Sequence, residues 1–104
     1  MHVELLVVPD CPNEAPARAL LRAALEALGL TGETFTTTVI HTQELAEKRA
    51  FTGSPTFLID GQDPFAERGR EPGLTCRIYL NDGAPGGVPE LSALLPALRR
   101  AATG

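Results

Sequence analysis

The chain has 104 residues, of which 43% are hydrophobic and 21% charged, a balance that predicts one globular domain spanning residues 1–104. Nine basic residues stand against 13 acidic ones, giving a formal net charge of −4, and the basic residues are scattered along the chain. This pattern excludes a nucleic-acid or anionic-membrane footprint. Because the apolar runs are too short for a signal peptide or a transmembrane helix, we expect a soluble protein of the cytoplasm.

The first 40 residues predict a strand, a helix and a second strand. Residues 3–8 are mostly apolar and indicate a buried strand. Residues 33–40 are rich in Thr and Val, with Phe35, Thr37 and Val39 on one side, and indicate a second strand. Between them, an amphipathic helix is predicted from residue 12 or 13 to residue 28, with Gly29 as a left-handed terminator. Charged residues at i,i+4 spacing mark the side of this helix away from its apolar stripe: Arg18, Arg22 and Glu26.

The middle of the chain predicts a short helix, a strand and a loop. Thr42 is placed to cap a helix that continues through Arg49. Residues 56–60 indicate a third strand that starts directly after a Ser-Pro pair. Residues 62–74 contain several Pro and Gly and predict a long loop, a kind of segment that is often functional.

The last 30 residues predict a fourth strand and a third helix. Residues 75–80 indicate the strand, and residues 81–87 form a Gly-rich turn that leads to Pro89 near the start of the helix. Pro96 falls inside this helix and lacks the N–H that the carbonyl of Ser92 would accept. We therefore expect a kink or an interruption there.

The predicted order β-α-β-α-β-β-α favours an α/β fold with a mixed four-stranded sheet and helices on both faces. This architecture resembles the thioredoxin fold, and the chain resembles it at two further points: Cys11 opens the first helix, and Pro55 directly precedes the third strand. In thioredoxin-like proteins this proline is typically cis and lies against the active cysteine. The resemblance therefore implies a cis Ser54–Pro55 bond beside Cys11, with Ser54, Pro55 and Thr56 positioning a substrate.

Cys11 is the main candidate for chemistry. It lies at a strand-to-helix junction, where free backbone N–H groups and the helix dipole favour an anion such as a thiolate. A C-x-x-C motif would place a second cysteine three residues later, but Glu14 stands there. Glu14 is either a proton donor or acceptor for Cys11 or only a favourable charge in the first helical turn. The alternative for Cys11 itself is a partly buried cysteine at a helix end, and Asp10 is expected to be a turn residue.

Two interpretations are open for Cys76. It alternates with Ile78 along the predicted fourth strand and so can face the core. Alternatively, the preceding loop returns Cys76 to Cys11, so that the two thiols meet in the tertiary structure. The two histidines lack metal-ligand spacing with either cysteine, and no cofactor is expected.

A more specific resemblance covers most of the chain. It is similar to small bacterial thioredoxin-like proteins related to alkylmercury lyase in its first cysteine with an acid three residues later and in three further segments: Gly53–Thr56, Asp63–Ala66 and Thr75–Tyr79. In those lyases two cysteines hold an organomercurial and the acid delivers the proton that cleaves the carbon–mercury bond. The resemblance implies these roles for Cys11, Cys76 and Glu14, with the two sulfurs as possible soft-metal ligands.

Three functions follow from these observations. The first is an enzyme of thiol chemistry, lyase-like or a monothiol oxidoreductase, acting through Cys11 on a small-molecule or protein thiol. The second is a binding protein in which Cys11 and Cys76 hold a soft metal or an organomercurial. The third is a thioredoxin-like interaction domain without catalysis.

Overall fold

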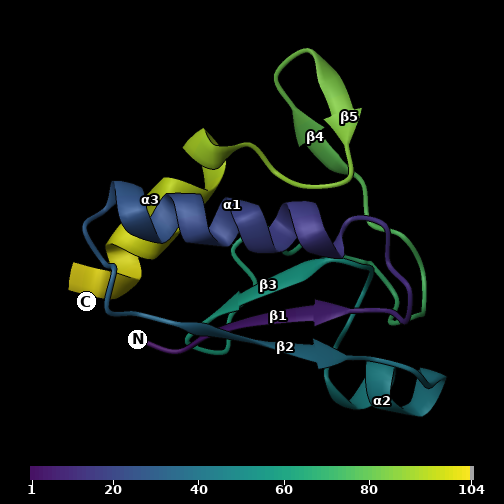
Figure 1. Cartoon of the computed structure of the whole chain (residues 1–104). Helices are drawn as coiled ribbons and strands as arrows, with labels where there is room; N and C mark the ends of the chain where they lie inside the picture. The colour runs from purple at the N-terminus through teal and green to yellow at the C-terminus, as the bar shows by residue number, and fades with distance from the viewer. Residues whose placement is uncertain (104) are drawn as a thin grey trace.

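The structure is a computed structural model that describes residues 1–103, and its elements are drawn in Figure 1. They are β1 (Val3–Val7), α1 (Glu14–Ala27), β2 (Phe35–Val39), α2 (Gln43–Lys48), β3 (Thr56–Ile59), β4 (Tyr79–Asn81), β5 (Ala84–Gly86) and α3 (Leu91–Thr103). The predicted order of elements is confirmed, with β5 as one further short strand inside the predicted turn 81–87.

The central sheet has three strands in the order β2-β1-β3. β1 runs parallel to β2, as the helix between them requires, and Leu5 is paired with Thr37. β1 runs antiparallel to β3, and there Leu5 is paired with Phe57. The carboxyl end of β1 therefore lies beside the start of β3, which brings the segment after β1 close to the Ser-Pro pair.

Helices cover both faces of this sheet, as predicted. Figure 1 shows α1 and α3 on one face and α2 on the other. Successive side chains of β1 point to opposite faces of the sheet, so β1 contributes to two cores. The core under α1 and α3 contains Val3, Leu5 and Val7. The core under α2 contains Leu6, which packs with Phe51.

Several local predictions are confirmed at the helix ends. The Thr42 side chain accepts a hydrogen bond from the backbone N–H of Leu45 at 3.1 Å, so Thr42 is the N-cap of α2. Gly29 follows α1 with φ +71°, the left-handed conformation that ends many helices.

α3 runs through Pro96 as one helix, so the predicted interruption is absent.

The predicted four-stranded sheet is wrong. Beyond β3, the chain makes one isolated parallel bridge, between Ser54 and Cys76, and β4 then pairs only with β5 as a separate hairpin. After this bridge, side chains rather than backbone groups make the hydrogen bonds to the start of β3. Arg77 donates to Thr56 Oγ1, and the Tyr79 hydroxyl donates to the carbonyl of Pro55. The turn after Asn81 then folds the chain back on itself.

Of the two interpretations for Cys76, the one that places it in the core beside Ile78 is wrong. Arg77 and Tyr79 are buried, each only 5% exposed. Cys76 is exposed, as are Ile78 at 58% and Leu80 at 88%. The buried arginine is satisfied by partners from the preceding loop, described below.

The three helices are short. Across residues 1–103, none combines the length and the apolar character that a bilayer crossing requires.

Candidate thiol site

Cys11 is held at the junction between β1 and α1. The chain turns after β1 through Asp10, whose φ of +56° makes it the turn residue that was predicted. The backbone N–H of Glu14 then donates to the carbonyl of Cys11 at 3.2 Å, which closes the first turn before α1. Cys11 is only 9% exposed and belongs to the core under α1. Its sulfur therefore sits at the edge of a packed layer rather than on a free loop.

Ser54 contacts this sulfur directly. The Ser54–Pro55 peptide bond is cis, as predicted, and both residues are fully buried. The backbone N–H of Val8 donates to Ser54 Oγ at 3.0 Å, and Ser54 Oγ lies 3.0 Å from Cys11 Sγ. Because the hydroxyl oxygen of Ser54 accepts the hydrogen bond from Val8, its own hydrogen is free to donate to the sulfur of Cys11.

The backbone of Cys76 is bridged to the backbone around Ser54. The backbone N–H of Ser54 donates to the carbonyl of Thr75 at 2.8 Å, and the N–H of Arg77 donates to the carbonyl of Ser54 at 2.9 Å. This bridge places the backbone of Cys76 about one strand spacing, ~4.8 Å, from Ser54. The two side chains differ in burial, since Ser54 is fully buried and Cys76 is exposed.

Gly53 makes this close approach possible. A Cβ atom at position 53 would lie 2.9 Å from Cβ of Arg77, and Gly53 has φ +155°, which side chains rarely tolerate. Any larger residue at position 53 would push segment 75–77 away from Ser54. The glycine before the Ser-Pro pair is therefore a requirement of the Cys76 placement.

A buried ion pair anchors the segment that carries Cys76. Arg77 Nη1 lies 2.6 Å from Asp63 Oδ2, and the guanidinium also donates to the carbonyl of Phe65. The guanidinium stacks over the ring of Tyr79 at 4.8 Å. Burial raises the pKa of the Tyr79 hydroxyl, so it remains protonated and continues to donate to the carbonyl of Pro55.

Thr56 lies away from the sulfur. Its hydroxyl donates to the carbonyl of Gly53 at 2.6 Å and accepts from Arg77 at 3.3 Å. In the sheet Thr56 is paired with Leu6, which belongs to the core under α2. Thr56 therefore stabilises the turn around the cis bond from inside, on the face opposite the core that contains Cys11.

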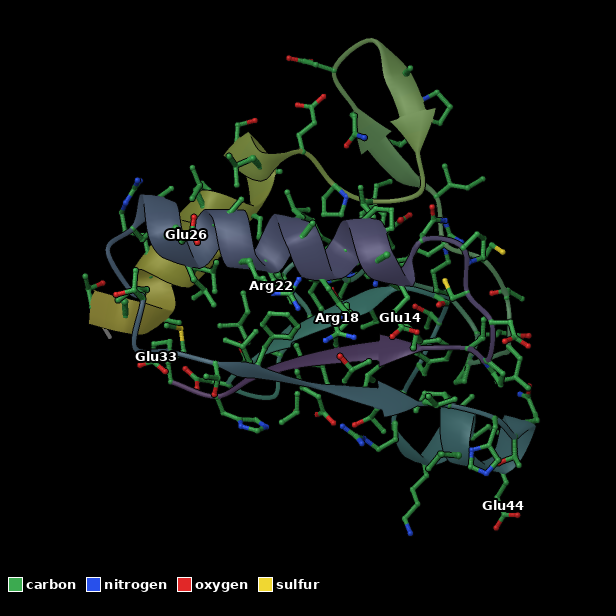
Figure 2. All side chains as sticks on the ribbon, viewed as in Figure 1. Glu14, Arg18, Arg22, Glu26, Glu33 and Glu44 are labelled. Atoms are coloured by element: carbon green, nitrogen blue, oxygen red, sulfur yellow. The ribbon has the colours of Figure 1, made fainter. Side chains whose placement is uncertain are left out.

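An open depression lies in front of Cys11. It is lined by Cys11, Glu14, Ala15, Arg18 and Arg22. Figure 2 shows Glu14, Arg18 and Arg22 in a row along α1, with the two arginine side chains directed from the helix toward the sheet. Arg18 Nη1 lies 3.7 Å from Glu14 Oε2. The structure thus brings Cys11, Glu14 and Ser54 together.

The two arginines were not predicted as part of the site. Sequence reasoning assigned them to the outer face of the helix, yet their spacing carried the signal, because positions 14, 18 and 22 are one helical turn apart and follow directly from Cys11. The row therefore runs along one side of α1, away from the thiol.

The potential metal ligands near this site are the two thiols and the carboxylate of Glu14. Both cysteines are free. Within the described part of the chain, no group of three or more His, Cys, Asp or Glu side chains is arranged to hold a metal ion. A soft metal at this site would therefore depend on two sulfurs.

Comparison with known proteins assigns no family. No protein-family model, no curated protein and no solved structure matches this chain.

Proposed function

We propose that this chain is a thioredoxin-like thiol protein in which Cys11 is the reacting nucleophile. The fold assignment is supported by the sheet order β2-β1-β3, with β1 parallel to β2 and antiparallel to β3. It is also supported by the cysteine just before α1 and by the cis proline just before β3. These features coincide with the two points at which the sequence resembles that fold.

The observation that carries the functional proposal is the contact between Ser54 Oγ and Cys11 Sγ, 3.0 Å long and buried. A sulfur accepts hydrogen bonds better as a thiolate than as a thiol, and the thiolate is the nucleophile in cysteine chemistry. A hydroxyl aimed at a cysteine at the start of a helix therefore supports a reactive role over a packing role.

The reaction that this geometry supports best is thiol–disulfide exchange. The Cys11 thiolate attacks one sulfur of a disulfide, forms a mixed disulfide with it, and releases the other half as a thiolate. Glu14 lines the same depression and can relay a proton from solvent to that leaving thiolate. A free thiol from solution then attacks the substrate sulfur of the mixed disulfide, forms a new disulfide with it and releases the Cys11 thiolate. If Cys76 attacks the Cys11 sulfur instead, the substrate half leaves as a thiolate and a Cys11–Cys76 disulfide remains, which a thiol from solution must then reduce.

A second candidate function is favoured by the bridge between Ser54 and Cys76. It places the second cysteine beside the residue that contacts the first. Two thiolates would hold the mercury of an organomercurial, and Glu14 would give its proton to the carbon as the carbon–mercury bond breaks. Free thiols suit a reducing compartment, so we place either activity in the cytoplasm.

Exchange is tested with a small neutral disulfide, bis(2-hydroxyethyl) disulfide, and the Cys76→Ser variant, in which Cys11 is the only thiol. We expect mixed-disulfide formation, followed by mass spectrometry, to be faster in the folded variant than in the same variant unfolded in urea. The Cys11→Ser variant measures the contribution of Cys76 alone. If folding slows the reaction of Cys11 or leaves it unchanged, Cys11 is a packing residue and the proposal fails.

The mercury function is tested by titrating the protein with mercuric ion and methylmercury while free thiols are counted. One mercuric ion should consume both thiols of the wild type, and Cys76→Ser should bind much more weakly. Glu14→Gln should keep binding but release no methane from methylmercury. If Cys76→Ser binds mercuric ion as tightly as the wild type, the two cysteines do not share a site, and the second candidate is rejected.

A further inference from the structure

A groove continues from the thiol site along α1. It lies between α1 and β2, encloses about 300 Å³, and is lined on its apolar side by Leu25, Leu30 and Phe35. Arg18 and Arg22 line both this groove and the depression that contains Cys11. The two hollows therefore share a wall, and a ligand whose sulfur meets Cys11 would extend past the two arginines.

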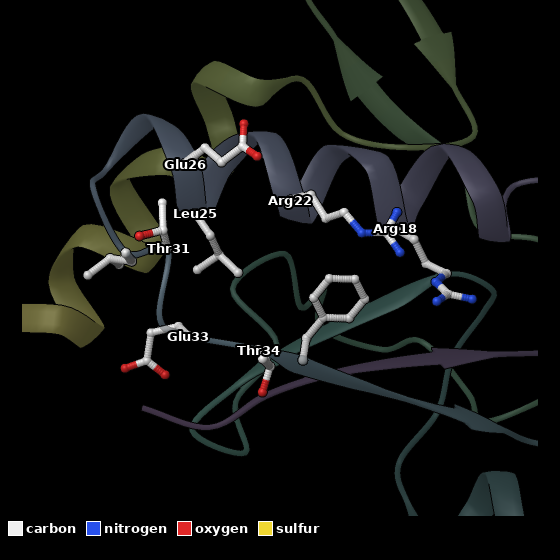
Figure 3. A pocket seen from close by; sticks show the side chains of 9 residues that line it. Arg18, Arg22, Leu25, Glu26, Thr31, Glu33 and Thr34 are labelled. Atoms are coloured by element: carbon white, nitrogen blue, oxygen red, sulfur yellow. The ribbon is translucent and has the colours of Figure 1, made fainter.

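The charge in this groove is positive close to the thiol. Figure 3 shows the guanidinium groups of Arg18 and Arg22 at the same end of the groove, whereas Glu26 and Glu33 lie toward the other end. Arg18 has one carboxylate partner, Glu14, at 3.7 Å, and Arg22 has none among residues 1–103. The formal net charge of the whole chain is −4, so this positive end stands out against an acidic protein.

Neither arginine side chain donates a hydrogen bond to another residue within residues 1–103. Nε of Arg18 is shielded from solvent and has no hydrogen-bond partner among the described residues. The Arg22 guanidinium lies 5.8 Å from the ring centroid of Phe35, which holds it over the groove without occupying its N–H groups. An arginine presents five N–H donors in a planar fork that suits a carboxylate.

We propose that Arg18 and Arg22 bind the carboxylate of a small anionic disulfide whose sulfur is attacked by Cys11. This inference rests on the proposed exchange reaction and adds its substrate class. The carboxylate lies between the two guanidinium groups, and the carbon chain extends along α1 so that the disulfide reaches Cys11. Attack forms the mixed disulfide on Cys11 and releases the other half of the substrate as a thiolate, with no further reactant.

The test compares three small disulfides that differ mainly in charge: 3,3′-dithiodipropionate (a dianion), bis(2-hydroxyethyl) disulfide (neutral) and cystamine (a dication). Rates of mixed-disulfide formation at Cys11 are measured in the Cys76→Ser background. We expect the dianion to react about tenfold faster than the neutral disulfide, since a charge-assisted hydrogen bond contributes enough for such a factor. Cystamine should be the slowest.

Arg22→Gln should lower the ratio of the dianion rate to the neutral-disulfide rate severalfold, because the lost charge-assisted hydrogen bond serves the carboxylate. Arg99→Gln is the matched control, since it makes the same change in net charge on the exposed side of α3. Equal rates for the dianion and the neutral disulfide, or equal effects of the two substitutions, would overturn the inference and leave the exchange activity standing. Failure of the neutral disulfide itself to react at Cys11 would reject the proposed function.

Discussion

The hydroxyl oxygen of Ser54 lies 3.0 Å from the sulfur of Cys11, although the two residues are 43 positions apart in the chain. The contact exists because β3 runs antiparallel to β1, which returns the start of β3 to the place where β1 ends. The backbone of Val8, just after β1, completes the arrangement by donating to the same hydroxyl. One short sheet thus supplies both the thiol and its hydrogen-bond donor.

Replacing Ser54 with Ala should slow alkylation of Cys11 by iodoacetamide about fivefold at neutral pH, since one hydrogen bond of roughly 1 kcal/mol to the anionic sulfur is lost. At strongly alkaline pH, where every thiol is ionised, the rates of variant and wild type should converge. The measurement is a timed labelling series read by mass spectrometry at both pH values. Ser92→Ala, the same change on an exposed position of α3, is the control. An unchanged neutral rate for Ser54→Ala would show that the hydroxyl does not support the thiolate.

The relative labelling rates of Cys76 and Cys11 should depend on the size of the labelling reagent. Cys76 is exposed and Cys11 is 9% exposed, so a bulky maleimide should modify Cys76 first. Iodoacetamide is small enough for the open depression, so the preference for Cys76 should shrink or reverse. Peptide mapping after partial labelling gives both ratios, and labelling in urea gives the reference in which accessibility is equal. A bulky reagent that prefers Cys11 would contradict the burial of this sulfur.

Glu4 should make the stability of the fold depend on acid. Burial raises the pKa of the Glu4 carboxyl, but the hydrogen bond from Thr38 and the Arg49 guanidinium outweigh it and hold the pKa below its usual 4.5. Because the unfolded chain binds this proton more readily, the contribution is complete above about pH 4.5 and is lost as the pH falls through the folded-state pKa.

Glu4→Gln should therefore lower the free energy of unfolding by about 1–2 kcal/mol at pH 7, between the values for exposed and buried ion pairs. Urea unfolding at pH 7 and near pH 3 checks this, and the difference from wild type should shrink at the lower pH. Glu71→Gln, on an exposed loop position, is the control. A difference that grows as the pH falls would have the wrong sign for this explanation.

Removing Arg77 should destabilise the protein strongly. Arg77→Ala leaves the Asp63 carboxylate, 16% exposed, without its partner at 2.6 Å, and breaking a buried pair in this way costs about 3 kcal/mol. Combining Arg77→Met with Asp63→Asn should recover part of the loss, because no unpaired charge remains. Arg68→Ala, on an exposed position of the same loop, should change the free energy of unfolding by less than about 0.5 kcal/mol. Equal losses for Arg77→Ala and Arg68→Ala in urea unfolding would refute the anchoring role.

The parts of the fold that could be predicted are those with local causes. The cap at Thr42 and the left-handed Gly29 are set by neighbouring residues, and both were predicted. The cis bond at Pro55 was predicted from the resemblance to a known fold.

Segment 75–80 was not predictable in the same way. Its apolar residues alternate, so the pattern indicates that Ile78 faces the core, whereas the structure buries Arg77 instead. A buried guanidinium needs partners, and those partners are Asp63 and the carbonyl of Phe65, which only the folded loop brings together. The role of Arg18 and Arg22 in lining the groove was not predicted for a related reason. A row of charged residues on a helix is equally typical of a face exposed to solvent.

The way in which the loop is fastened has a dynamic consequence. Between β3 and β4 the chain is held mainly by the Arg77 ion pair, the short bridge at Cys76 and a few single hydrogen bonds, such as that from Gly73 N–H to the carbonyl of Phe51. Cys11, in contrast, is held by the central sheet and α1. Segments with few backbone hydrogen bonds of their own open at lower free energy than the sheet they rest on. Native-state hydrogen exchange should therefore resolve two cooperative units, with the amides of residues 75–77 exchanging through a smaller opening than those of β1. The two thiols would then belong to units that open independently, and Cys76 could move away from Ser54 while Cys11 stays in place.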